Sequence, residues 1–287
     1  MAKVWFITGA SSGFGDAFAR YALAKGYSVV ATARDTAKLA AIAAIAPERV
    51  LVHRLDVTQP GEAEAAVAAA IARFGRIDVL INNAGYGIVG AVEETPEAEL
   101  RAQMETNFFG AVAVTQAALP QLRSQGSGAI VNISSLGGQL SMPGFGAYSA
   151  SKFALEGLSE ALAGEMAPFG VKVMIVEPGA FRTGFAGAGA MKHMPILAPY
   201  RDIVSGTRDF AHGMHESQAG DPLKAAAAID TALAAENTPL RLQLGRDGVD
   251  AVRAHAEALL AEIAVWESLA VATAFETAAE PASREDA

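Results

Sequence analysis

Tyr148 and Lys152 are the two residues whose types and spacing most directly suggest chemistry. They lie four positions apart in a segment with helical spacing, so their side chains share one face of a helix. A free tyrosine, with a pKa of about 10, is a poor base at neutral pH. A lysine cation close by favours the phenolate and should lower that pKa. We therefore predict that Tyr148 exchanges a proton with an alcohol or carbonyl oxygen.

Two serines follow the apolar run Ala129–Ile133, shortly before this pair in the sequence. A serine hydroxyl at the end of a strand could hydrogen-bond the substrate oxygen and hold the reacting carbon in place for hydride transfer. Ser134 and Ser135 are both candidates by their residue type. Tyr148 and Lys152 would each be unremarkable alone, as a half-buried core tyrosine and a solvated lysine.

A glycine-rich turn near the start of the chain could hold the phosphates of a dinucleotide. The run Thr8-Gly-Ala-Ser-Ser-Gly-Phe-Gly15 follows an apolar strand and precedes a helical segment. Glycines let the backbone come close to a pyrophosphate, whose charge lies at the positive end of the helix. This placement predicts dinucleotide binding. The candidate residues are Gly9, Ser11, Ser12, Gly13, Phe14 and Gly15.

The end of the second strand indicates which dinucleotide is bound. An acidic residue there would bind a ribose 2′-hydroxyl and repel a 2′-phosphate. Ala33 stands at the expected acidic position and Arg34 follows it. Because an arginine offers a donor fork suited to phosphate, NADP(H) is favoured over NAD(H). If Asp35 faces the ribose instead, the preference reverses, and both charges could also be solvated loop residues.

The elements that must position these residues alternate between strands and helices. Such alternation predicts βαβ units and one doubly wound, Rossmann-type parallel sheet with helices on both faces. The expected strands are Val4–Ile7, Ser28–Thr32, Val50–Leu55, Val79–Ile81, Ala129–Ile133, Val171–Val176 and Leu240–Leu244. The expected helices are Phe14–Ala24, Thr36–Ile45, 60–74, 96–122, Ala147–Ala167, Asp221–Ala235 and 247–269.

The regular pattern breaks after the sixth strand. Residues 180–220 show no steady period, which favours a long loop with short helices that acts as a substrate lid, or else a disordered insertion. We expect one catalytic domain over residues 1–275 and a flexible acidic tail over 276–287.

In their order along the chain, these motifs resemble the short-chain dehydrogenases/reductases, an NAD(P)-binding family. The resemblance covers residues 3 to 185 and is highly specific as an ordered set. Besides the glycine-rich turn, it rests on Leu55-Asp-Val57, Asn82-Asn-Ala-Gly85, Asn107, Asn132-Ile-Ser-Ser135, Tyr148-Ser-Ala-Ser-Lys152, and Pro178-Gly179 with Thr183.

The resemblance also implies roles for individual residues. Family spacing selects Ser135 rather than Ser134 as the catalytic serine. It implies a water-linked proton relay between Asn107 and Lys152, and a contact of Lys152 with the nicotinamide ribose. Tyr148 and Lys152 thus also count as cofactor-binding residues. Further cofactor-binding positions implied by the family are Asp56 and Val57 near the adenine, Asn83, Ala84 and Gly85 in the cleft, and Pro178, Gly179 and Thr183 over the nicotinamide.

Composition narrows the functional classes. A net charge of −9 argues against nucleic acid as a partner, and the lack of cysteines excludes disulfides and thiolate chemistry. His212 and His215 are expected to be polar loop residues rather than metal ligands, and no metal site is predicted. No apolar run reaches the length of a membrane span, and no targeting segment is seen, so we expect a cytoplasmic protein.

The function expected is therefore reduction of a ketone or aldehyde, or the reverse oxidation, on a small molecule. A weaker resemblance to the 17β-hydroxysteroid and retinol dehydrogenases suggests a lipophilic or aromatic substrate. The lid could supply apolar lining from Phe181, Phe185, Met191, Met194, Ile196, Leu197 and Tyr200. Alternatives are a catalytically silent NADP sensor and a nicotinamide-dependent epimerase or dehydratase. Relatives imply a homodimer or homotetramer.

Overall fold

One seven-stranded parallel sheet forms the centre of the molecule in the computed structural model, which describes residues 2–186, 190–213 and 218–275. The strand order is β3-β2-β1-β4-β6-β7-β9. The strands are β1 Val4–Ile7, β2 Ser28–Ala33, β3 Val50–Arg54, β4 Val79–Asn82, β6 Gly128–Ile133, β7 Val171–Pro178 and β9 Arg241–Leu244. All seven were predicted from the sequence, and the fold class is confirmed.

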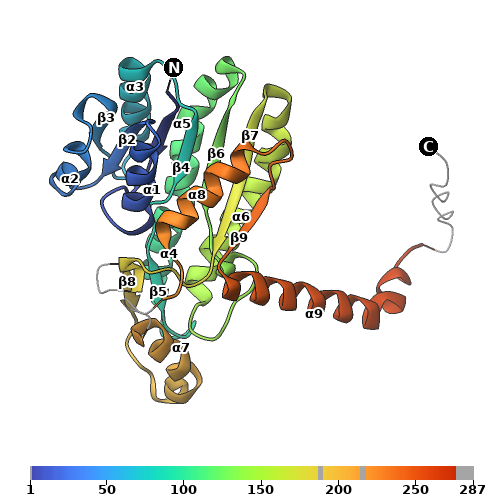
Figure 1. Cartoon of the computed structure of the whole chain (residues 1–287). Helices are drawn as coiled ribbons and strands as arrows, with labels where there is room; N and C mark the ends of the chain where they lie inside the picture. Colours follow the sequence, from blue (N-terminus) through green and yellow to red (C-terminus); the bar gives the residue numbers. More distant parts are fainter. Residues whose placement is uncertain (1, 187–189, 214–217, 276–287) are drawn as a thin grey trace.

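Helices cover both faces of this sheet (Figure 1). The helices α1 (Gly13–Ala24), α2 (Ala40–Ala43) and α8 (Pro222–Ala234) pack on one face, against side chains such as Trp5 and Ile7. The helices α3 (Glu62–Phe74), α5 (Gly110–Gln125) and α6 (Gly146–Met166) pack on the other, against Phe6 and Leu80. Side chains that alternate along β1 therefore enter two separate cores, as the period of a strand requires.

The strand order reverses between β1 and β4, which pair directly, Trp5 with Val79 and Ile7 with Ile81. The chain winds outward from this point in both directions, to β3 at one edge and to β9 at the other. Open α/β sheets bind ligands at the carboxyl ends of the strands beside such a reversal. The glycine-rich turn follows β1 directly, so the fold places it there.

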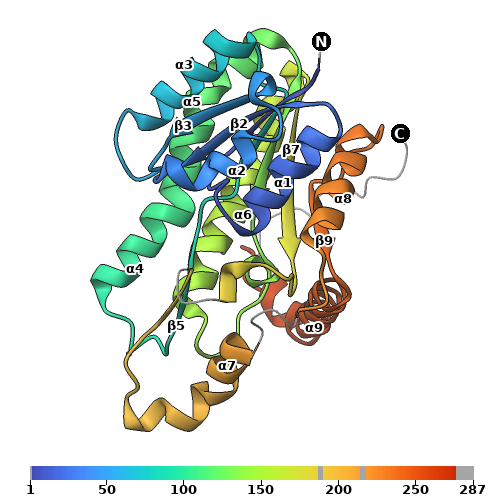
Figure 2. The ribbon, with the colours of Figure 1, turned by 60° about the vertical axis from the view of Figure 1, so that its left-hand side comes forward.

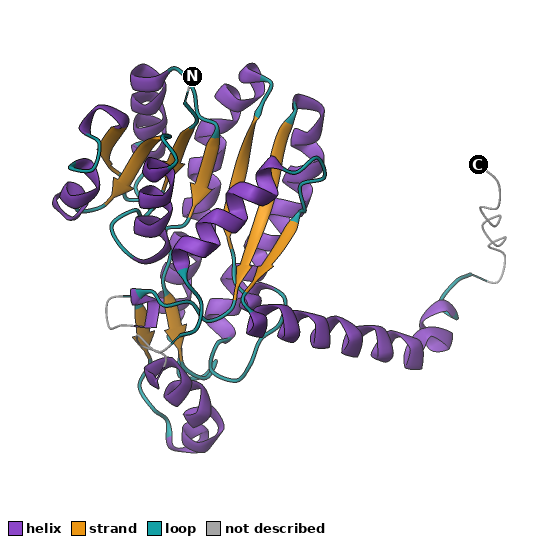
Figure 3. Ribbon diagram, viewed as in Figure 1, coloured by secondary structure: helices purple, strands orange, loops and turns teal. Residues whose placement is uncertain are grey.

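A small second sheet was not predicted. The strand β5 (Gly87–Val89) pairs in parallel with β8 (Met191–His193), outside the main sheet. Figure 3 shows these two short strands beside α7 (Arg201–Gly213), below the carboxyl ends of the main strands. Each has only three residues, which is too short for a periodic signal in the sequence.

The segment 180–220 is more ordered than the predicted loop. It contains β8, short 3-10 turns at Gly184–Ala186 and Ala198–Tyr200, and the thirteen-residue helix α7. The described part of this segment is therefore not the disordered insertion that the sequence left as an alternative. His215 and the expected tail over 276–287 lie outside the described residues.

Two predicted helices are interrupted. The helix expected over 96–122 is α4 (Glu97–Met104), a π-helical turn (Glu105–Phe109) and α5. The helix expected over Thr36–Ile45 is a 3-10 turn, Thr36–Leu39, followed by the short α2, with a second 3-10 turn at Pro47–Arg49.

The last helix, α9 (Arg246–Val271), leaves the body of the molecule (Figures 1 and 2). Its first turn lies beside the loop after β7, while most of its length makes no contact with the sheet. Within the described residues, no helix combines the length and the apolar character needed to cross a membrane. The same residues hold no group of three or more acidic or histidine side chains placed to bind a metal.

Candidate active site

A cavity of about 780 Å³ opens at the carboxyl ends of β1, β4, β6 and β7. It brings together most of the residues predicted from the sequence, although they come from seven separate segments of the chain. Those that line it are Gly9, Ser11, Ser12, Gly13, Phe14, Arg34, Asp56, Val57, Asn83, Ala84, Gly85, Ser135, Tyr148, Lys152, Pro178, Gly179 and Thr183. Gly15 and Asn107 do not line it.

The glycine-rich turn has the geometry of a phosphate cradle. Gly9 and Gly13 have φ of +65° and +56°, which side chains rarely adopt. A Cβ on Gly15 would lie 2.2 Å from the carbonyl oxygen of Gly9, so only glycine lets α1 approach the turn. Ser12 begins this helix without a side-chain hydrogen bond to its first turn. The turn therefore fits a bound pyrophosphate at the positive end of α1.

Asn83 and Thr8 hold this turn against the end of β4. The Asn83 side chain donates from Nδ2 to the carbonyl oxygens of Thr8 (3.0 Å) and Gly9 (3.2 Å). The Thr8 hydroxyl oxygen accepts hydrogen bonds from the backbone N–H groups of Asn83 (2.9 Å) and Ala84 (3.0 Å). Asn83 thus has a structural task in addition to its place in the cavity wall.

The two charges at the end of β2 differ in what surrounds them. Arg34 is exposed and lines the cavity. Asp35 caps the following 3-10 turn, where its Oδ1 accepts from the Ala37 N–H at 3.1 Å. Asp56 makes a similar turn after β3, since its Oδ1 accepts from the Thr58 N–H (3.1 Å) and hydroxyl (2.8 Å).

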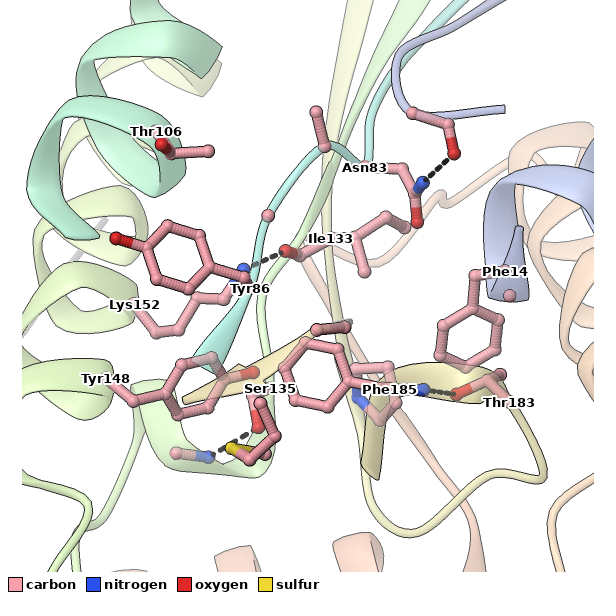
Figure 4. Close-up of a pocket in the computed structure, with 18 of the residues that line it drawn as sticks. Phe14, Asn83, Tyr86, Thr106, Ile133, Ser135, Tyr148, Lys152, Thr183 and Phe185 are labelled. Atoms are coloured by element: carbon pink, nitrogen blue, oxygen red, sulfur yellow. Dashed lines mark hydrogen bonds between the residues drawn. The ribbon is translucent and has the colours of Figure 1, made fainter. Parts of the chain in front are cut away.

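Tyr148 and Ser135 lie together in the cavity wall (Figure 4). The Ser135 Oγ accepts from the Gly137 N–H at 3.0 Å, which fixes the side chain. Burial raises the pKa of Tyr148 to about 12, and a hydrogen bond with Ser135 opposes the rise. The expectation that the pKa of Tyr148 falls below that of a free tyrosine is wrong, because desolvation of the phenolate dominates.

Lys152 points into the same region from the next turn of α6. Its Nζ donates to the carbonyl oxygen of Ile133 at 2.8 Å and lies 5.7 Å from the centre of the Tyr148 ring. Burial lowers the pKa of Lys152 to about 8, and the negative charge of Glu156 works in the opposite direction. Lys152 therefore titrates close to neutral pH.

The two candidate serines face different partners. Ser134 is buried, and a Cβ on Gly138 would meet its Oγ at 2.4 Å and the Glu156 Oε1 at 2.9 Å. The Ser134 hydroxyl thus lies beside the Glu156 carboxyl group. Ser135 is the serine that lies beside Tyr148. A Cβ added to Gly137 would lie 3.4 Å from both the Ser135 Oγ and the Tyr148 ring, so the two side chains share one neighbour.

Asn107 lies behind the cavity, in the π-helical turn. Its Nδ2 donates to the Tyr86 carbonyl oxygen (2.9 Å) and to the Ser151 Oγ (3.1 Å), and its Oδ1 accepts from the Tyr86 N–H. Extra residues in a helical turn often occur at functional sites. This one turns Asn107 toward α6, the helix that carries Tyr148 and Lys152.

The segment expected to be a lid supplies only part of the apolar lining predicted from it. Phe181, Phe185 and Met191 line the cavity. The other four proposed residues do not: Met194 packs against Ile88 and Ala147, Ile196 and Leu197 are exposed, and Tyr200 donates to Glu93. These side chains belong to the outer surface and to a separate small core of the lid.

Several lining residues were not predicted. The ring centre of Phe145 lies 6.1 Å from that of Tyr148, close to the predicted Phe185, whose ring centre lies 5.8 Å from it. Tyr86, Met142 and Gln218 also line the cavity. Their positions depend on loops that fold back over the site. A single residue in a loop has no periodic pattern in the sequence that would predict its place in a cavity.

Comparison with known proteins gives one consistent result. A family model described as short chain dehydrogenase matches residues 3–192. The crystal structure of a short-chain dehydrogenase from Streptomyces avermitilis is 52% identical, with a TM-score of 0.91 over 96% of this chain and all of that chain.

Two further proteins extend this likeness. A 3-ketodihydrosphingosine reductase from Bacteroides thetaiotaomicron is 41% identical over 85% of this chain and 88% of its own length. A short-chain dehydrogenase/reductase from Burkholderia phymatum, solved in complex with NAD, is 26% identical, with a TM-score of 0.81 over 91% of this chain and 95% of that chain.

Proposed function

The chain belongs to the short chain dehydrogenase family and is an oxidoreductase, and from this premise we propose that it reduces a lipophilic or aromatic ketone with NADPH. Tyr148 is the general acid of this reaction, and the same residue is the base in the reverse oxidation of the alcohol. The observation that carries the proposal is the meeting of Tyr148, Ser135 and Lys152 in the cavity that also contains the glycine-rich turn.

A bound nicotinamide cofactor supplies the hydride in reduction and accepts it in oxidation. The chain's own residues control the proton and the geometry. Ser135 donates a hydrogen bond to the carbonyl oxygen, and Tyr148 donates the proton that completes the alcohol. Because burial raises the pKa of Tyr148 to about 12, the phenol holds its proton at neutral pH, which suits reduction. The Lys152 cation then stabilises the phenolate that remains.

The preference for NADPH rests on Arg34. Its guanidinium is exposed at the cavity, where it can pair with a ribose 2′-phosphate. Asp35, which would favour NADH if it faced the ribose, is engaged in capping the turn after β2. The glycine cradle and the Asp56 turn are compatible with either nicotinamide cofactor. The Burkholderia phymatum relative was solved with NAD, so the proposed selectivity for NADPH rests on Arg34 and Asp35 of this chain and not on the family likeness.

The substrate class is inferred from the walls around Tyr148. Phe145, Phe185 and Met191 pack in one small cluster with Tyr148, and Met142 lines the same cavity. Such an apolar lining favours a ketone with an aromatic or aliphatic substituent over a small polar one. The Bacteroides relative, named as a reductase of a 3-keto substrate, is in keeping with ketone reduction.

The test follows NADPH oxidation by absorbance against a panel of aromatic and aliphatic ketones, with the native protein and with Tyr148→Phe. We expect ketone-dependent turnover that needs NADPH and that falls at least a hundredfold in the variant, the size of a typical general-acid contribution. NADPH binding without turnover on any ketone or alcohol would favour a cofactor sensor. Failure to bind either cofactor would refute the proposal.

A further inference from the structure

Two buried carboxyl groups lie directly behind the proposed catalytic residues. Glu177, in β7, is fully buried, and Glu156, in α6 one turn after Lys152, is 4% exposed. The Gln139 Nε2 donates to both, at 3.1 Å to Glu156 Oε2 and 3.1 Å to Glu177 Oε1. The Gln243 Nε2 donates to Glu177 Oε2 at 2.8 Å. We refer to Glu156 and Glu177 as the carboxylate pair.

One arginine serves this pair. The Arg241 Nε lies 3.0 Å from Glu156 Oε2 and 3.6 Å from Glu177 Oε1, and its Nη2 reaches the exposed Glu160 at 2.9 Å. Burial raises the pKa of both carboxyl groups, and Arg241 opposes the rise. A single guanidinium therefore faces two buried carboxyl groups.

Lys152 is a second buried cation in this region, one turn before Glu156 in α6. The structure gives it no ion pair among the described residues, and its Nζ donates to the backbone oxygen of Ile133. Because a buried charge without a partner is costly, a negative charge close by stabilises the charged form of Lys152.

Glu156 is the member placed to act on Lys152. The two residues are four positions apart in α6, on one face of the helix. Burial lowers the pKa of Lys152, and Glu156 is the charge that opposes this change. The groups that face Glu156 from the surrounding elements are Arg241, Glu177, Gln139 and Ser134, with Glu160 on its own helix.

We propose that Glu156 is a positioning residue that keeps Lys152 protonated behind the active-site cavity, and that Arg241 and Gln139 hold it there. This inference rests on the proposed function, because it gives Lys152 a cationic role beside Tyr148. It also gives Ser134 a task, since its hydroxyl lies beside the Glu156 carboxylate.

The consequence for pH dependence has a definite sign. A negative charge near Tyr148 and Lys152 disfavours loss of a proton from either residue. The sign of the effect is therefore the same whichever of the two gives up its proton first. Removing the charge of Glu156 lowers the pH at which the first proton leaves. Activity in ketone reduction is present below that pH and is lost above it, so the alkaline limb moves to lower pH.

The first experiment needs neither cofactor nor substrate. The protein is labelled with ¹³C at the lysine ε-carbons, the Lys152 signal is assigned from Lys152→Arg, and its shift is titrated with pH. We expect a midpoint at about pH 8 in the native protein. In Glu156→Gln we expect it lower by about one pH unit, the size of an effect from one nearby charge.

Two variants separate charge from packing. Glu160→Gln removes the neighbouring, exposed carboxylate that also pairs with Arg241, and should leave the midpoint in place. Glu156→Asp keeps the negative charge on a shorter side chain, so the Lys152 midpoint should stay close to its native value. If the Lys152 midpoint is the same in Glu156→Gln and in the native protein, the proposal is overturned.

The second experiment measures kcat/KM for ketone reduction from pH 6 to pH 10, a range of about two units around the Lys152 midpoint. Glu156→Gln should move the alkaline limb of this profile to lower pH by about one unit. At a given pH on the limb, kcat/KM then falls about tenfold. A lower plateau with an unmoved limb would show a merely structural role and overturn the proposal. Absence of turnover in the native protein would instead refute the proposed function and leave the lysine titration interpretable.

Discussion

Burial acts in opposite senses on the two proposed proton-transfer residues. It raises the pKa of Tyr148 to about 12 and lowers that of Lys152 to about 8. Both changes have one cause, since each favours the uncharged form of its group. At neutral pH the phenol is protonated and the amine mostly charged, which is the state that a proton donor with a cationic neighbour requires.

At the same scale, Gly15 controls the approach of α1 to the glycine-rich turn. A methyl group there would lie 2.2 Å from the Gly9 oxygen and 2.8 Å from the Asn83 Nδ2, so the turn must move. We predict that Gly15→Ala weakens NADPH binding at least tenfold, about 1.4 kcal/mol. Titration of NADPH fluorescence measures this. The control is Gly157→Ala, where a Cβ on the exposed face of α6 meets no atom within 4 Å.

Gly157→Ala should bind NADPH as the native protein does and be more stable by up to about 1 kcal/mol, because alanine favours a helix interior. Equal NADPH affinities in the Gly15 and Gly157 variants would mean that the turn does not hold the cofactor.

Arg34 is expected to select between the two cofactors. Replacing it with alanine removes a charge-assisted contact worth about 1.5–3 kcal/mol. We therefore predict that Arg34→Ala weakens NADPH binding about tenfold or more and leaves NADH binding unchanged. Lys38→Ala, which removes an exposed cation from the next turn of the chain, is the matched control. If both cofactors lose the same affinity, Arg34 does not read the 2′-phosphate.

At the scale of elements, one buried ion pair fastens α7, in the segment expected to be a lid, to the body. The Arg208 Nη2, in α7, lies 2.7 Å from the Glu94 Oε2, and its Nη1 donates to the Met194 oxygen at 3.0 Å. Glu94 also accepts from the backbone N–H groups of Ala91 and Leu197. These bonds together outweigh the effect of burial and lower the pKa of Glu94. The pair joins α7 and the residues after β8 to the loop after β5.

Removing Arg208 should loosen this lid. Arg208→Ala leaves the Glu94 carboxylate buried without its cation, and breaking such a pair costs about 3–5 kcal/mol. We predict faster amide hydrogen exchange in α7 and a raised KM for the ketone, with the exchange of the main sheet unchanged. Arg201→Ala, at the exposed start of α7, should change neither quantity. Unaltered exchange in α7 would show that the ion pair does not fasten the lid.

The lid also shows where prediction from the sequence ends. The seven main strands could be predicted because each is a continuous apolar run bounded by turns, as Val173–Val176 illustrates. The three-residue strands β5 and β8 are held by pairing with each other, which is a long-range contact without a local pattern. In the same way, spacing indicates that Tyr148 and Lys152 are neighbours. It does not give the sign of the pKa change, because that depends on everything packed around them.

For the whole molecule, α9 is the feature that a single copy does not explain. Figure 1 shows it extending from the body, and the large apolar side chains from residue 259 onward are half exposed or more. These are Leu259, Leu260, Ile263, Val265, Trp266, Leu269 and Val271 in α9, and Phe275 shortly after it. A contiguous exposed apolar surface of this kind is typical of a contact between proteins. We propose that α9 packs against a second copy of the chain in a homodimer or homotetramer.

The test at this scale is the mass of the particle in solution. Trp266→Glu places a charge at the middle of the exposed apolar side chains, where burial against a partner would leave it unpaired at a cost of several kcal/mol. We predict that sedimentation velocity finds the native protein as a dimer or tetramer and Trp266→Glu as a smaller species. Ile45→Glu, which charges an exposed apolar residue on the body, should keep the native mass. A native monomer, or an assembly that Trp266→Glu leaves intact, would mean that α9 is not the contact between copies.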